Sequence, residues 1–483
     1  MDAGHDATHD AAKDTGTKDV AAKDVEHADA GMDATGTDAR DAEVADAVDH
    51  DGAKDGAVDA PPDGPKDGST DAHDAGAPLV TYYFMGRWDT TSQPGYATEP
   101  VAEWAGSAVF GTFTGTAIAF DVVETPSSTA ASLGGGGYDS LSVVIDKQPP
   151  VVFALGAGYP GTACPLPTPQ TCVTGENAVQ VTTTLAPGQH TIAIYKTTDP
   201  FYGGKIQFKQ FIPAASGALV KASYAFPHHI EWIGDDLNIG RGVGTEPPAC
   251  TVMNAETTQM NGASNESLSY AAKVSTDFNA ERHNISIGSS GVAASLGGNA
   301  KTIPSIYDFV LPDEPTNAWS FTEWSPGVAA PELVVVNLGS YGDFTNCGTG
   351  DDCADIGATG TPPVGTTAAA FATAYESFLA NLRMIYPSAF ILVVSGNGYA
   401  GNITPDAASD LVSYVVNQRV AAGEKLTGAN PTMGFYTDYM EVDANDFTYT
   451  CGVYPDAASQ AVLAGTVTPA VGVEGAIHTA LGW

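Results

Sequence analysis

Basic side chains are scarce in this sequence. Its 483 residues hold 19 Lys and Arg against 57 Asp and Glu, which gives a formal charge of −38. Nucleic acids and anionic membrane surfaces are bound through basic patches, so neither is an expected partner. Apolar runs long enough to span a bilayer are also lacking. These absences favour a soluble, secreted or surface protein with a neutral ligand.

Large apolar side chains are missing from the N-terminal region. Residues 1–77 contain no Ile, Leu, Phe, Trp, Tyr or Cys, and they carry 21 acidic and 6 basic side chains. Such a segment buries too little apolar surface to offset chain entropy, so we expect a disordered Asp- and Ala-rich tether. An acidic metal-binding tail is the alternative interpretation.

The tether resembles those that follow the lipidated cysteine of bacterial surface lipoproteins. No signal peptide is visible after Met1, and the cysteine itself is absent. We hypothesise that the chain is a mature form whose export signal was removed. A secreted or cell-surface location, with a lipid anchor upstream of Met1, is therefore an expectation from the resemblance.

Six cysteines lie in segments rich in Gly, Pro and Thr, and no CxxC pair is present, which disfavours a zinc site. An even number in loops suggests disulfides and an oxidising compartment. If the two pairs of cysteines that are close in sequence form disulfides, the two remaining cysteines would form the third. Sequence alone permits fifteen connectivities. The candidate pairs are Cys164 with Cys172, Cys347 with Cys353, and Cys250 with Cys451.

Residues 78–218 have a β-like pattern. Short alternating segments rich in β-branched and aromatic residues are separated by Gly, Pro and Asn. The pattern predicts a β-sandwich of jelly-roll type. The segments are "AVFGTFTGTAIAFDVV", "YDSLSVVID", "NAVQVTTTL", "HTIAIYKTT" and "GGKIQFKQF".

Residues 219–483 alternate short apolar runs with helical stretches. Continuous apolar runs are typical of strands buried on both faces of a parallel sheet. "TTAAAFATAYESFLANLRMIYP" predicts an amphipathic helix that Pro387 ends, and Thr404 with Pro405 predicts the start of another. We expect a three-layer α/β domain. The runs are Ile230–Gly234, Asn284–Gly288, Glu332–Gly339, Phe390–Gly396 and Met433–Tyr436.

Several phrases, in order, resemble the SGNH hydrolases, and in particular the family two carbohydrate esterases. They are "MGRWD", "EWAGSAVFGTFTGTAIAF", "HHIEWIGDDLNIGRGVG", "NESLSYAAKVSTDFNAERHNISIGSSGV", "ELVVVNLGSYGDF" and the closing "LGW". The resemblance covers about residues 80–483. It implies a jelly roll joined to a three-layer, flavodoxin-like SGNH domain, in which a serine attacks an acetyl ester.

The resemblance also assigns the catalytic roles, and the residues present do not match them. The serine position is Asp236, the histidine position is Tyr454, and Gly452 replaces the aspartate two residues earlier. The asparagine position is Tyr341, or a neighbour if Gly342 is an insertion. The second-block glycine falls near Ser289, with Gly288 and Gly291 on either side. We therefore expect no intact catalytic set and no esterase activity.

No histidine is expected to replace the missing base. Five of the ten lie in the tether, and the others fall in the jelly roll, before strands or on the last helix; they are His190, His228, His229, His283 and His478. Carboxylates do form covalent intermediates, so an active esterase that uses Asp236 as nucleophile is the alternative. Asp236 also suits the first turn of a helix starting at this elbow.

The resulting hypothesis is an exported, catalytically degenerate protein that binds a neutral polysaccharide or glycan at the old cleft. Asp236, Tyr341, Phe344 and Tyr454 are the candidate ligand-binding side chains. We expect a monomer with no cofactor and no metal. Asp351, Asp352 and Asp355 cluster oxygens of the kind that calcium favours, but their spacing matches no calcium loop, so a solvated acidic loop is the preferred interpretation. A purely structural surface protein is the remaining alternative.

Overall fold

In the computed structural model, secondary structure is described for fourteen segments of the chain. The cysteines, the proposed tether, Gly452 and Tyr454 all lie outside them. The segments are residues 82–127, 139–155, 178–181, 185–201, 203–221, 223–243, 264–295, 301–339, 341–344, 363, 365–395, 405–424, 455–465 and 472–483.

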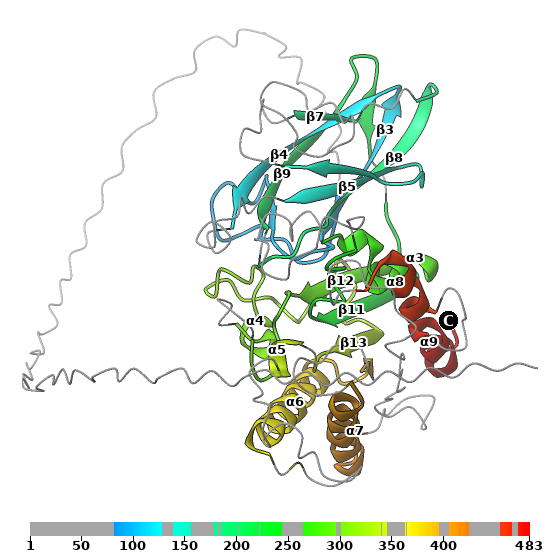
Figure 1. The fold of residues 1–483 in the computed structure, drawn as a ribbon. Coiled ribbons are helices and arrows are strands. Elements are labelled where there is room, and N and C mark those ends of the chain that lie inside the picture. The colour runs from blue at the N-terminus through cyan, green and yellow to red at the C-terminus, as the bar shows by residue number, and fades with distance from the viewer. Residues whose placement is uncertain are drawn as a thin grey trace, which may run out of the picture. The chain divides into compact units, whose positions relative to one another are not determined.

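Two antiparallel sheets form the first part of the described chain (Figure 1). One has the order β1 (Tyr83–Met85), β3 (Ala108–Gly115), β8 (Gly188–Lys196), β5 (Ser140–Ile145), β6 (Val151–Ala154), with β10 (Ala218–Val220) also paired to β3. The other has the order β2 (Val101–Ala102), β9 (Gly204–Pro213), β4 (Ile118–Pro126), β7 (Ala178–Val181).

The inner faces of these sheets share one apolar core. In β4 the side chains of Ile118, Phe120 and Val122 are buried and alternate with partly exposed neighbours, as expected for a strand with one face on a core. They join Phe113 from β3 and Phe208 from β9 in the same cluster. Side chains from both sheets therefore meet in the middle, which makes this part a β-sandwich.

A parallel sheet follows, with the order β12 (Ala280–Ser286), β11 (His228–Gly234), β13 (Leu333–Asn337), β14 (Phe390–Val393). All five residues of β13 are buried, since both faces of the sheet are covered. Because all four strands run the same way, their carboxyl ends lie at one edge of the sheet, where ligands bind in open α/β folds.

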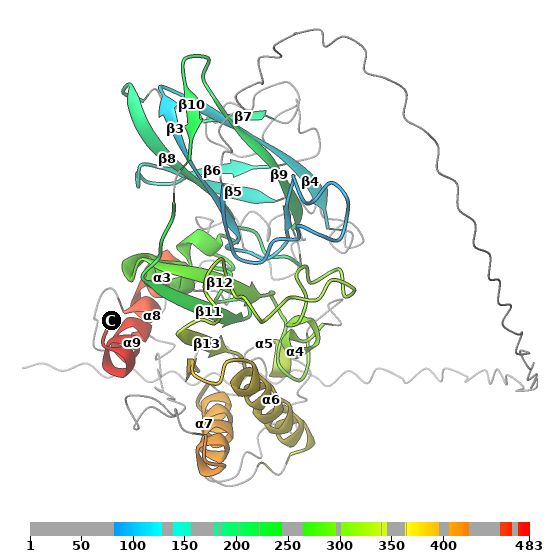
Figure 2. The same cartoon turned by 180° about the vertical axis from the view of Figure 1, so that it is seen from behind.

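Helices cover the two faces of this sheet (Figures 1 and 2). One face packs on α4 (Ile303–Ile306), α5 (Tyr341–Phe344), α6 (Thr366–Ile385) and α7 (Pro405–Ala421). The other packs on α3 (Tyr270–Asp277), α8 (Ala457–Ala464) and α9 (Val473–Leu481), and the 3-10 turn η1 (Glu266–Leu268) precedes α3. The predicted α/β class with an additional β-sandwich is confirmed.

The predicted elements match closely where they are described. The periodic stretch that ends before Pro387 is α6, and its Phe371, Tyr375, Phe378 and Leu382 are buried, while Pro405 is the first residue of α7. The strand bounds shift by up to four residues, and β12 differs most, because it starts at Ala280 and not at Asn284. The expected strand at 433–436 lies outside the described residues.

Buried and partly buried polar contacts join sandwich residues to the α/β part. The Arg87 guanidinium lies 3.4 Å from the Glu231 carboxylate, and both side chains are fully buried. The Glu266 amide donates to the Thr197 carbonyl at 2.9 Å, and Lys205 pairs with Glu314 at 2.6 Å. No helix within the described segments has the length and hydropathy needed to cross a membrane.

Candidate functional site

The elbow after β11 is a series of tight turns. Beyond Gly234 the Gly240 amide bonds to the Leu237 carbonyl at 3.1 Å, and the Arg241 amide bonds to the Asp236 carbonyl at 2.9 Å. The sequence predicted a helix starting at Asp236, but residues 235–243 form turns instead. The Arg241 bond spans five residues and not the four of an α-helix.

The Asp236 side chain is held by two donors at the carboxyl edge of the sheet. Its Oδ1 accepts a hydrogen bond from Arg241 Nη1 at 2.6 Å and another from the Ser289 backbone amide at 3.0 Å. Arg241 Nη1 also donates to Ser289 Oγ at 2.6 Å. Asp236 is 5% exposed, so the ion pair is shielded from water and its hydrogen bonds are of the stronger, charge-assisted kind.

Ser289 lies in the turn after β12 and has a left-handed backbone, with φ of +62°. Glycine adopts this conformation far more readily than serine. The resemblance predicts the family's second-block glycine near Ser289, and the Ser289 backbone has the conformation that glycine favours. The turn aims the Ser289 amide at Asp236.

The absence of a side chain at Gly288 lets two carboxylates lie close to its backbone. A Cβ at this position would lie 2.2 Å from Asp199 Oδ2 and 2.8 Å from Asp236 Oδ1. Since real Cβ atoms do not approach other atoms so closely, any larger residue at 288 would push these carboxylates apart. Gly288 is thus required for the cluster as it stands.

Asp199 comes from the sandwich and not from the α/β part. It follows β8, and its Oδ1 accepts from the Gly288 amide at 3.1 Å and from the Phe201 amide at 3.0 Å. The loop is anchored by a buried ion pair between Lys196 and Asp139 at 2.8 Å. A sandwich side chain therefore fixes the turn that carries Ser289.

A third turn is fixed by Asp343 in α5. Its carboxylate accepts from three successive amides at 2.8–3.1 Å, those of Val292, Ala293 and Ala294. A Cβ on Gly291 would lie 2.2 Å from the Asp343 carboxyl carbon. Asp343 thus holds the backbone of residues 292–294, which follow Ser289 in the second-block segment.

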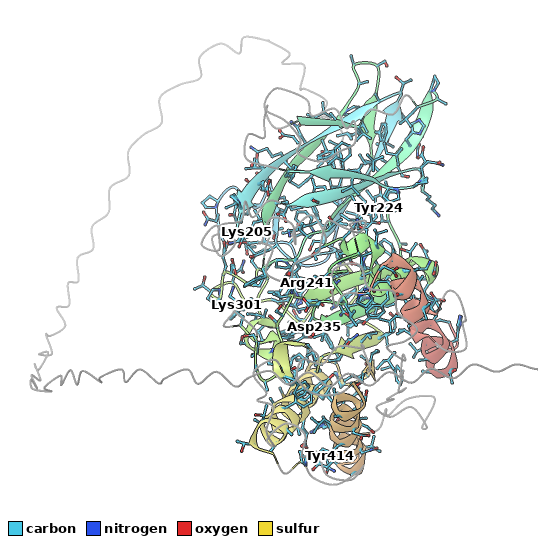
Figure 3. All side chains as sticks on the ribbon, viewed as in Figure 1. Lys205, Tyr224, Asp235, Arg241, Lys301 and Tyr414 are labelled. Atoms are coloured by element: carbon cyan, nitrogen blue, oxygen red, sulfur yellow. The ribbon has the colours of Figure 1, made fainter. Side chains whose placement is uncertain are left out.

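Burial raises the pKa of three acidic side chains around the elbow. Burial raises the pKa of Asp199 to about 6, against the attraction of Arg241. Burial raises the pKa of Asp343 to about 6 as well, although the three backbone amides oppose it. For Asp235, burial and then the charges of Asp236 and Asp343 hold the pKa well above its usual value. Figure 3 labels Asp235 and Arg241 beyond the end of β11.

The described histidines have their contacts elsewhere. His190 bonds to Asp146 at 2.6 Å in the sandwich, and His229 bonds to Glu332 at 3.2 Å at the start of β11. His228 stacks on Trp483, and His478 lies against Phe278.

His283 corrects a detail of the sequence analysis. It lies inside β12 and not before it, since the strand begins three residues earlier. Its ring stacks on Trp324 at 3.7 Å. Among the described side chains, no group of three or more His, Cys, Asp or Glu is arranged to hold a metal ion.

Solved structures of carbohydrate esterases match this chain over most of its length. A family two enzyme from Clostridium thermocellum, in complex with cellohexaose, is 22% identical with a TM-score of 0.61, over 83% of this chain and 100% of that one. A family two enzyme with a carbohydrate-binding domain, from Corynascus thermopiles (Myceliophthora fergusii), is 20% identical with a TM-score of 0.58, over 83% and 100%.

A further match is to a carbohydrate esterase whose active site displays divergent catalytic and non-catalytic binding functions. It is 15% identical with a TM-score of 0.55, over 80% of this chain and 96% of that one. This chain has the fold of the family two carbohydrate esterases. Identities of this size establish the esterase fold alone. No protein-family model matches the sequence, and no curated protein matches it.

The esterase fold brings several predicted residues together. Asp236, Gly288 and Ser289 converge at one point, and Gly291 lies one turn further, against Asp343. Tyr341 begins α5, but its side chain lies outside the described part, as do Gly452 and Tyr454. The assignment of the family's catalytic roles to these positions stays a prediction.

Phe344 requires a correction. It was expected to face a ligand, but it is 1% exposed and packs on Phe371 with ring centroids 4.9 Å apart. It lies in the last turn of the short helix α5, where an aromatic residue faces the core beneath the sheet. Phe344 therefore packs in the core and is unavailable for stacking on a sugar ring.

Sequence reasoning missed three residues of the site, Arg241, Asp199 and Asp343. Arg241 had a local signal, since it is the single basic residue in "IEWIGDDLNIGRGVG", five residues after Asp236. Asp199 had none, because its contact with Gly288 spans 89 residues and crosses from the sandwich to the α/β part.

Proposed function

We propose that this protein is an esterase-like binding protein that lacks serine-esterase chemistry and binds a neutral polysaccharide or glycan. One observation carries the first half of the proposal. At the position where the resemblance expects the nucleophilic serine, Asp236 donates no proton and instead accepts from Arg241 and the Ser289 amide. A carboxylate paired with a guanidinium has its negative charge stabilised, which lowers its nucleophilicity.

The same contacts argue against an oxyanion hole in working order. Acyl transfer needs preorganised N–H donors that face the developing oxyanion. Here the Ser289 amide points at a carboxylate of the chain itself, whose negative charge would also repel an oxyanion nearby. No described histidine has a contact with Asp236, so a histidine base, the usual partner of a nucleophilic serine, is missing from the described residues of the elbow.

Glycan binding is supported by the relatives of this fold. One solved relative holds cellohexaose, and another has an active site with non-catalytic binding functions as well as catalytic ones. A neutral sugar also avoids the charge cost that the acidic cluster imposes on an anion. Export to a cell surface, where polysaccharides are found, belongs to the same proposal.

Two measurements test the proposal. Hydrolysis of p-nitrophenyl acetate should not exceed that of a heat-denatured control, since losing one triad member already costs ~10⁴-fold. Retention on affinity gels should occur with at least one neutral polysaccharide, with a dissociation constant of roughly micromolar to millimolar for a few contacts. Turnover that disappears in Asp236→Ala would refute the loss of chemistry, and absence of retention on every gel would refute glycan binding.

A further inference from the structure

The contacts around Asp236 describe a receptor for a carboxylate group. A guanidinium nitrogen at 2.6 Å and a backbone amide at 3.0 Å converge on a single oxygen, Oδ1. Guanidinium and N–H groups of this kind are what proteins use to bind carboxylates and other oxyanions. The group that fills the receptor is a side chain of the same protein.

The receptor is built rather than incidental. Arg241 is 5% exposed and Ser289 is 4% exposed, and Arg241 Nη1 is fixed a second time by Ser289 Oγ at 2.6 Å. The left-handed backbone of Ser289, with φ of +62°, holds its amide toward the same point. Asp199 fixes the preceding residue through the Gly288 amide at 3.1 Å. These parts do not depend on the Asp236 side chain.

The surroundings then decide which ligands are admitted. Asp199 and Asp235 lie near enough to Asp236 to feel its charge. An incoming carboxylate would meet these acidic groups and find both donors already occupied. A sugar hydroxyl carries no charge, so it meets no such barrier.

We propose that Arg241 and Ser289 form a carboxylate-binding site that Asp236 occupies from within, and that this internal occupation makes the protein select uncharged sugars over uronic acids. Asp236 is then the specificity-determining residue of the elbow. The selectivity for sugars rests on the proposed glycan-binding function, whereas the internal carboxylate site does not.

The internal site is tested by chemical rescue of the full-length chain. Asp236→Ala removes the carboxylate and leaves Arg241 and the Ser289 amide without it. Sodium acetate should then raise the melting temperature of this variant above its value in sodium chloride of equal ionic strength. The rise should saturate at ~2–6 °C, because a ligand that binds the folded state stabilises it by mass action.

Matched variants give the controls. Wild-type protein, whose site is filled, should show no acetate-specific shift, and the double variant Asp236→Ala, Arg241→Gln should show none because the guanidinium is gone. Asp236→Ser carries the smaller side chain that the resemblance expects there, and it should respond as Asp236→Ala does. If a variant is unfolded in chloride, recovery of its circular dichroism signal in acetate replaces the melting temperature as the readout.

The two parts of the proposal fail separately. The internal carboxylate site is overturned if acetate has no effect on either single variant, or if it raises the melting temperature of wild type and the double variant as much as that of the single variants. For selectivity, wild type should be retained on a neutral polysaccharide and not on polygalacturonate, while Asp236→Ala should gain retention on polygalacturonate. A wild-type protein that binds polygalacturonate overturns the selectivity, and one that binds no polysaccharide refutes the proposed function while leaving the acetate result standing.

Discussion

Replacing Glu231 by alanine should cost about 4–5 kcal/mol of unfolding free energy. Glu231 lies in β11, is fully buried, and accepts from Tyr307 Oη at 2.6 Å, Trp324 Nε1 at 2.7 Å and Tyr386 Oη at 2.8 Å. The Arg87 guanidinium lies 3.4 Å away. One carboxylate thus satisfies three buried donors and one buried cation.

Two estimates give this magnitude. Breaking a buried ion pair by removing one partner costs about 3–5 kcal/mol, because a charge is left uncompensated. Three hydrogen bonds to a charged acceptor, at about 1.5 kcal/mol each, fall in the same range. In the Glu231→Ala variant Arg87 still donates to the Phe309 carbonyl at 3.0 Å. Because the guanidinium keeps this partner, we do not expect a cost above this range. A domain is stable by only about 5–15 kcal/mol, so the loss is a large share of the total.

Urea unfolding of wild type and Glu231→Ala measures the difference, provided the slope with urea is unchanged. Glu332→Ala is the matched control. Like Glu231, Glu332 is a carboxylate with an ion-pair partner, in this case His229 at the start of β11. Its side chain is 46% exposed, so its loss should cost only ~0–1 kcal/mol. A Glu231→Ala variant as stable as Glu332→Ala would refute the reasoning that the buried carboxylate is indispensable to its four partners.

Three further predictions concern the elbow. Asp236→Ser alone should leave p-nitrophenyl acetate hydrolysis at the level of a heat-denatured control, because no described histidine contacts that position; strong turnover would reveal a base elsewhere. Gly288→Ala should lower the free energy of unfolding by roughly the 1–3 kcal/mol typical of overpacking, and with it the melting temperature, since its Cβ would lie 2.2 Å from Asp199 Oδ2; an unchanged melting temperature would mean that the carboxylates move apart freely. Burial raises the pKa of Asp199 to about 6 in the folded protein, so between about pH 4 and 6 the folded state binds more protons than the unfolded state and stability falls as pH rises. Urea midpoints between pH 4 and 7 should therefore fall less steeply in Asp199→Asn than in wild type, and identical slopes would contradict the assignment.

The sequence predicted the fold well because its signals are local. Apolar runs such as Glu332–Gly339 show a strand buried on both faces, and the spacing from Phe371 to Leu382 shows one face of a helix; β13 and α6 confirm both. Both patterns depend only on residues near one another in the chain. The start of β12 was missed, because its first four residues, Ala280–His283, are mostly polar and charged while still fully buried.

The site was predictable only in part. Asp236 and Ser289 were found because quoted motifs place them at strand ends, where parallel strands bring their carboxyl termini together. The sequence did not indicate what Asp236 would bind. Its partner Arg241 depends on the path of the turns between them, and Asp199 depends on how the sandwich loop packs, which no local pattern records.

The reach of Asp199 into the elbow has a consequence for modularity. A gene cut in the linker between the sandwich and the parallel sheet would separate Gly288 from the carboxylate that holds its amide. Grafting the α/β half onto another carrier, or exchanging the sandwich for one from a distant homologue, would remove the side chain that holds the turn after β12 in place. Recombination between relatives is therefore expected to preserve the two halves as one inherited unit, with Asp199 and Gly288 exchanged together.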